Sequence, residues 1–116
     1  LMSVKSGDIV SVPIERTIRD FVYVDDITQA ITKLISYRPK EAYEVFNIGG
    51  GVGIDLNDII SNAEKITKTT LNINFIQSDK SSEFYLNINK AKNAFGFEPR
   101  DITCGMELFW DFLKSE

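Results

Sequence analysis

The 116-residue sequence has no histidine and a single cysteine, Cys104. Histidine is the commonest metal ligand of proteins and their usual general base near neutral pH. Histidine-based catalysis is therefore excluded within this chain, and no metal site is expected. One cysteine cannot form an internal disulfide. Because no partner base is evident for Cys104, we expect it to be a small buried residue near a helix N-terminus.

Long apolar runs and an excess of positive charge are missing as well. No run approaches the ~18 apolar residues that a membrane span requires, and the first residues lack a signal-peptide pattern. The net charge of −4 and the pI near 4.8 argue against nucleic acid or an anionic membrane as a partner. These features predict a cytoplasmic protein, formed by one domain or a piece of one.

The hydrophobic pattern predicts a mixed α/β chain. Its clearest element is a helix from Asp26 to about Arg38, capped by Asp25 or Asp26, in which apolar residues recur at i, i+3, i+4, i+7 and i+8. Three more helices are predicted: one after a cap at Asp55 or Asn57, a short one from Asn87 or Asn89 to Gly96 with Phe97 packed back, and one from about Thr103.

Period-two alternation and β-branched residues predict the strands. The ranges are 8–12, 18–24, 42–48 and 71–76, with the first two as candidates for pairing. Residues 77–84 are polar, lack periodicity and are predicted to be a loop.

Arg19 lies in the second predicted strand, on one face with Phe21 and Tyr23. A guanidinium among aromatic residues needs an anionic partner, because burying it unpaired is costly. Two partners remain open at this point. One is a neighbouring carboxylate, Asp20 or Glu15, and the other is a ligand phosphate, which the planar guanidinium can bind through two hydrogen bonds.

The glycine-rich run from Gly49 to Gly53 stands between a predicted strand and a predicted helix, where a phosphate-binding loop would lie. The G-x-G-x-x-G pattern fails, because its last position holds Ile54 or Leu56. We therefore expect a structural turn that uses positive φ angles and does not bind NAD.

Three stretches, taken in order, resemble a known family. They are residues 19–27 (Arg-Asp-Phe-Val-Tyr-Val-Asp-Asp-Ile), residues 44–51 (Glu-Val-Phe-Asn-Ile-Gly-Gly-Gly), and Asn-Lys-Ala-Lys at 89–92 followed by Phe-Gly-Phe-Glu-Pro at 95–99. Together they resemble the C-terminal part of extended short-chain dehydrogenases/reductases, the NAD-dependent nucleotide-sugar epimerases and dehydratases. The resemblance covers roughly residues 15–113.

The resemblance implies that residues 1–116 are a single C-terminal fragment of a Rossmann-type enzyme. NAD would be bound mainly by a preceding domain, and residues 26–48 would supply the last helix and strand of that dinucleotide-binding half. The intact enzyme would act on a nucleotide-diphospho-sugar through a transient keto sugar. None of the four tyrosines has lysine four residues later, so the Tyr-x-x-x-Lys pair of the family, and with it every catalytic residue, is expected upstream.

The resemblance also implies three substrate-binding residues. Arg19 matches the arginine that binds the substrate phosphate in the family. Lys80 and Glu83 are the nearest match to the family's Arg-x-Gly-Asp or Arg-x-Gly-Glu loop, in which the arginine meets the pyrophosphate and the acid meets the nucleoside sugar. Lysine in place of arginine loses the planar fork, and Asp79 is an alternative match to the acid.

A different class of function also fits the sequence. The chain could be a stand-alone, non-catalytic α/β binding or interaction module, which predicts a start codon near Leu1 and a self-sufficient core. The family resemblance instead implies a homodimer for the intact enzyme. It also implies an isolated chain that binds no NAD and self-associates through the surfaces that the preceding domain would cover.

Overall fold

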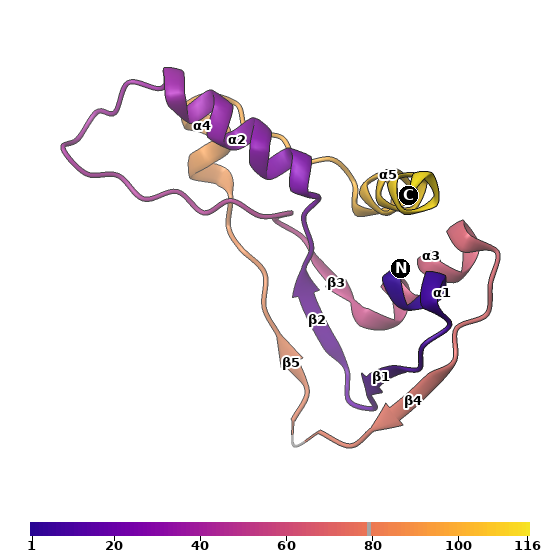
Figure 1. The fold of residues 1–116 in the computed structure, drawn as a ribbon. Helices are drawn as coiled ribbons and strands as arrows, with labels where there is room; N and C mark the ends of the chain where they lie inside the picture. The colour runs from indigo at the N-terminus through magenta and orange to yellow at the C-terminus, as the bar shows by residue number, and fades with distance from the viewer. Residues whose placement is uncertain (79) are drawn as a thin grey trace.

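The computed structural model describes residues 1–78 and 80–116 (Figure 1). The helices are α1 (Met2–Ser6), α2 (Val24–Ser36), α3 (Leu56–Thr67), α4 (Asn89–Phe95) and α5 (Ile102–Ser115). The strands are β1 (Val10–Pro13), β2 (Thr17–Asp20), β3 (Gly53–Asp55), β4 (Ile73–Ile76) and β5 (Ser82–Glu83). None of these helices is long and apolar enough to cross a membrane.

The strands form two small sheets. β1 pairs with β4 in parallel, and β2 lies between β3, to which it is antiparallel, and β5, to which it is parallel. The predicted pairing of the first two strands is wrong. β1 takes its hydrogen bonds from β4, and bonds from Val10 N to Asn72 O and from Ile14 N to Ile76 O extend that ladder at both ends.

The predicted helices are present with shifted ends. α3 begins as predicted, because the Asp55 side chain accepts a hydrogen bond from Asn57 N at 2.9 Å. Gly96 ends α4 with a φ of 68°, and Phe97 packs back into the core, as predicted. The predicted cap of α2 is wrong, since the helix begins at Val24 after Tyr23 and has no side-chain cap.

Two predictions about extended segments also fail. Residues 42–48 are not a strand, because no strand in the described part of the chain pairs with them. The stretch 77–84 was predicted as a loop but contains β5. This strand pairs with β2, and bonds from Ser82 N to Arg16 O and from Phe84 N to Ile18 O support the pairing. Asp79 lies outside the described residues.

Asp26 is buried in the first turn of α2, with 2% of its surface exposed. Its Oδ1 accepts the Arg100 Nε–H at 2.7 Å, and its Oδ2 accepts the Arg100 backbone N–H at 3.1 Å. The hydrogen bond from the guanidinium to Asp26 raises the pKa of Arg100, whose guanidinium also lies over the Tyr23 ring. This ion pair joins α2 to the segment between α4 and α5, next to the core of Ala30, Ile88, Ala91 and Phe97.

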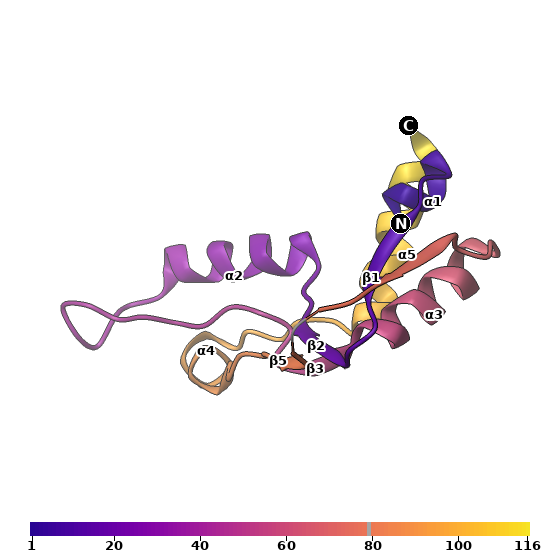
Figure 2. The same cartoon turned by 90° about the horizontal axis from the view of Figure 1, so that it is seen from below.

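The molecule is less compact than a typical domain of its length. α2 and the segment after it reach away from one end of the small sheets, whereas α1, α3 and α5 gather at the other (Figures 1 and 2). The radius of gyration is 16.7 Å, against about 13 Å for a compact domain of this size. The accessible surface is 7934 Å², against about 6,400 Å² for a compact monomer of this mass. The excess includes exposed apolar side chains on α2 and the following segment: Ile31, Ile35, Tyr43 and Val45.

Replacing Asp26 with asparagine should destabilise the fold by about 3 kcal/mol, because the guanidinium of Arg100 would then lack its buried counter-charge. Asp111→Asn is the matched control, since it breaks the exposed Lys114–Asp111 pair and should leave stability almost unchanged. Urea unfolding of both variants measures the difference. Adding Arg100→Met to Asp26→Asn should recover part of the loss, and equal effects of the two asparagine variants would contradict the assignment.

Candidate functional site

Arg19 is fixed across the β2–β5 pair. Its Nη2 donates to Ser82 Oγ at 2.7 Å, and its Nη1 donates to Ser82 O at 3.3 Å and to Ile18 O at 2.8 Å. Arginine has five N–H donors, so these three bonds leave part of the guanidinium available. A half-buried, oriented cation with free donors is a candidate for binding an anionic ligand.

The carboxylate partners that the sequence allowed for Arg19 are both wrong. Asp20 accepts hydrogen bonds from backbone amides. Glu15 accepts the Ser78 N–H at 2.9 Å, and this bond lowers the pKa of the Glu15 carboxyl. Among residues 1–78 and 80–116, the ion pairs join Arg16 to Asp55, Lys90 to Glu44, Arg100 to Asp26 and Lys114 to Asp111. Within that part of the chain, Arg19 has no acidic partner.

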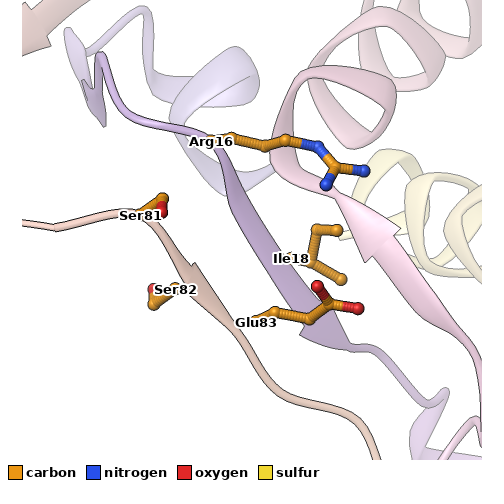
Figure 3. A pocket seen from close by; sticks show the side chains of 5 residues that line it. All are labelled: Arg16, Ile18, Ser81, Ser82 and Glu83. Carbon is orange, nitrogen blue, oxygen red and sulfur yellow. The ribbon is translucent and has the colours of Figure 1, made fainter.

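A pocket of about 210 Å³ lies at the same strand pair, and Figure 3 shows the side chains that line it. Arg16 at its rim pairs with Asp55 of β3, with Nε and Oδ2 3.3 Å apart. Glu83 is exposed and brings a negative charge to the other side. The pocket therefore offers both signs of charge to a ligand. Its lining residues are Arg16, Ile18, Ser81, Ser82 and Glu83.

The three predicted site residues do not converge. Thr17 pairs with Ser82 and Ile18 with Glu83, so alternation places Arg19 and Ser82 on one face of the strands and Glu83 on the other. Lys80 is exposed just before β5, and its carbonyl accepts the Ser78 hydroxyl. Because β5 is the last strand of its sheet, a ligand could reach both faces around this edge.

The glycine turn is structural, as predicted. Gly51 has a φ of 73°, and a Cβ at Gly50 would lie 2.2 Å from the Phe21 carbonyl oxygen. The Asp20 carboxylate already accepts the Gly50 and Gly51 N–H groups. A dinucleotide pyrophosphate would need such amides to be free. The residues of this turn therefore do not fit NAD.

The sequence did not predict two contacts of the site, and one prediction about a residue outside it is wrong. Ser82 stands at the glycine position of the loop matched at residues 80–83 and was given no role of its own, and Arg16 was not singled out. Their contacts arise from strand pairing between distant segments. The expected burial of Cys104 is wrong, because its side chain is exposed on α5. Within the described residues, no three histidine, cysteine or acidic side chains gather where they could hold a metal ion.

Comparisons with known proteins add a second line of evidence. No family model matches the chain. It is similar to the UDP-glucose 4-epimerase of Rhizobium meliloti (strain 1021), with 26% identity over 99 residues that cover 82% of this chain and 30% of that protein. The chain thus spans less than a third of this relative.

Solved structures show the same partial coverage. The UDP-glucose 4-epimerase of Thermotoga maritima, solved with UDP-glucose, matches with a TM-score of 0.81 and 27% identity over 97% of this chain and 37% of its own. The UDP-glucuronic acid 4-epimerase of Bacillus cereus, solved with NAD, matches with a TM-score of 0.79 and 26% identity. This match covers 97% of this chain and 35% of that protein. A dTDP-glucose 4,6-dehydratase from Bacillus anthracis shares the fold, with a TM-score of 0.81 at 19% identity. This match covers 99% of this chain and 37% of that protein.

Gly50→Ala should destabilise the fold by about 3 kcal/mol, because its Cβ would collide with the backbone of Phe21 and displace the turn from Asp20. Gly7→Ala is the matched control. Gly7 has a φ of 75° but open space around it, so alanine should cost only about 1 kcal/mol of backbone strain. Thermal unfolding of both variants tests this order, and a smaller effect at Gly50 than at Gly7 would refute the packing argument.

Proposed function

We propose that this chain, whose homologues and structural neighbours are UDP-sugar 4-epimerases and dehydratases of the extended short-chain dehydrogenase/reductase family, forms the substrate-binding part of an NAD-dependent nucleotide-sugar epimerase or dehydratase. The intact enzyme would convert its substrate through a transient keto sugar. The residues that carry out this chemistry, and most of the NAD site, would belong to another part of the intact protein. The chain alone would bind no NAD and turn over no substrate.

The observation that carries this proposal is that the guanidinium of Arg19 is oriented but has no acidic partner among the described residues. Ser82 and the Ile18 carbonyl orient its guanidinium, and the described residues supply no counter-charge. A diphosphate would provide that charge and accept the remaining N–H donors in a bidentate arrangement. Arg19 would thus bind the diphosphate that joins the nucleoside to the sugar.

Lys80 and Glu83 would complete the site around the edge of β5. Both are exposed and flank Ser82, the residue that Arg19 contacts. Lys80 would act as a point charge near the diphosphate, because a flexible ammonium lacks the planar fork. Glu83, on the opposite face, would accept hydrogen bonds from the hydroxyl groups of the nucleoside sugar.

Residues 26–48 would pack against an NAD-binding half of the intact protein. The open shape of the chain supports this, because the apolar side chains of α2 and the following segment have too few neighbours of their own. Residues 42–48, which have no strand partner in the described chain, would gain one at the edge of the parallel sheet of that half. The intact enzyme would be a cytoplasmic homodimer.

The stand-alone binding module remains the competing function. It requires a self-sufficient core, whereas the radius of gyration and the accessible surface both exceed those of a compact domain. The open reading frame upstream of Leu1 separates the two proposals. A reading frame that encodes G-x-x-G-x-x-G and Tyr-x-x-x-Lys supports the enzyme, and a start codon at Leu1 supports the module.

Arg19→Met should weaken the binding of UDP-glucose by the intact protein about tenfold to a hundredfold, because a charge-assisted bond to phosphate contributes about 1.5–3 kcal/mol. Arg19→Lys should recover only part of the affinity. The matched control is Arg16→Met, which removes the same charge from the pocket at the β2–β5 pair, a pocket that Arg19 does not line. Isothermal titration measures the affinity of each variant, and the melting temperature measures its stability. A lowered melting temperature with unchanged affinity, or a larger loss at Arg16, would contradict the proposal.

The isolated chain should self-associate as its concentration rises, because the apolar surface of α2 and residues 42–48 is uncovered. Ile35→Glu should reduce this association, since Ile35 is 81% exposed on α2. Ile9→Glu is the matched control, an isoleucine 62% exposed outside that surface. Light scattering over a concentration series measures the mass. A monodisperse monomer at high concentration would contradict the proposed covering surface.

A further inference from the structure

The carboxylate of Asp20 accepts three backbone N–H groups from two segments that are distant in the sequence. Oδ1 accepts from Gly50 N, and Oδ2 accepts from Gly51 N and from Leu86 N, both at 3.0 Å. Asp20 ends β2, the glycine turn precedes β3, and Leu86 follows β5. One side chain thus connects all three strands of the central sheet at the same end.

The surroundings of Asp20 fit this carboxylate closely. A Cβ at Gly49 would lie 3.0 and 3.1 Å from its two oxygens, and a Cβ at Gly50 would lie 3.1 Å from Oδ1. Only glycine lets the backbone approach the carboxylate this closely without displacing it. The turn from Gly49 to Gly51 is therefore built around the Asp20 side chain.

The bond to Leu86 matters most for β5, which is only two residues long. The backbone bonds from Ser82 N to Arg16 O and from Phe84 N to Ile18 O flank its short parallel ladder with β2. The Asp20–Leu86 bond holds the chain two residues beyond Phe84, and it is stronger than a bond to a neutral carbonyl because its acceptor is a carboxylate. It thus restrains the segment that carries Ser82, the contact of Arg19.

We propose that Asp20 is a positioning residue for ligand binding. It holds β5 against β2, so that Ser82 keeps the guanidinium of Arg19 in its ligand-binding orientation. The side chain of Asp20 does not touch the ligand, because its oxygens are taken up by the three amides. The identity of that ligand rests on the proposed function, whereas the restraint on β5 does not.

The restraint is tested by amide hydrogen exchange in Asp20→Asn. Asparagine keeps the shape but loses the charge and one acceptor, so exchange at Phe84 and Leu86 should accelerate about tenfold, as expected for the loss of a charge-assisted bond. The matched control is Asp101→Asn, because Asp101 also accepts a backbone N–H, from Thr103 at 2.8 Å, but caps α5. Unchanged exchange at Phe84 and Leu86 in Asp20→Asn would overturn the proposal.

The consequence for the ligand is tested by titrating UDP-glucose into the intact protein. Asp20→Asn should weaken binding about tenfold, and it should raise KM with little change in kcat, whereas Asp101→Asn should change neither. Because Asp20 acts through Arg19, the double variant Asp20→Asn with Arg19→Met should bind no more weakly than Arg19→Met alone. Wild-type protein that binds neither UDP-glucose nor any member of a panel of UDP-, dTDP-, GDP- and CDP-sugars would overturn the proposed function. Wild-type binding with an unchanged dissociation constant in Asp20→Asn would overturn the role of Asp20 alone.

Discussion

Acidic side chains that accept backbone N–H groups hold this chain together where its short strands cannot. Each strand has four residues or fewer, so many amides lie beyond the reach of a ladder and need another acceptor. Carboxylates accept these amides, mostly where distant segments meet. Glu15 binds the amide of Ser78, Asp20 binds those of Gly50, Gly51 and Leu86, Asp26 binds that of Arg100, and Glu64 binds that of Leu71.

The local part of this fold could be predicted from the sequence. The Asp55 cap and the Gly96 end of α4 depend on residues within one turn of each other, and both are confirmed. The failures involve partners that are distant in the sequence. Residues 42–48 have the composition of a strand but pair with no strand of the described residues, and β1 pairs with β4 across more than fifty residues. Asp26 looked like a helix cap because its buried partner, Arg100, lies 74 residues away.

The candidate site divides in the same way. The sequence indicated Arg19, because a cationic residue within a strand pattern can be recognised from the sequence alone. It did not indicate that Ser82, inside the matched loop, contacts Arg19, because this contact arises only through the register of β2 and β5. That register also separates Arg19 from Glu83, since neighbouring residues of a strand face opposite ways. A spacing rule taken from the loop alone therefore overstates how closely these side chains cooperate.

The exposed thiol of Cys104 has a practical consequence. It is the only cysteine of the sequence, and it lies on α5, in an element separate from β2 and β5. An exposed thiol reacts readily with maleimide reagents once it is deprotonated. A fluorophore or spin label can thus be attached at one defined position without mutagenesis, and it would report on the environment of α5 from outside the candidate ligand site.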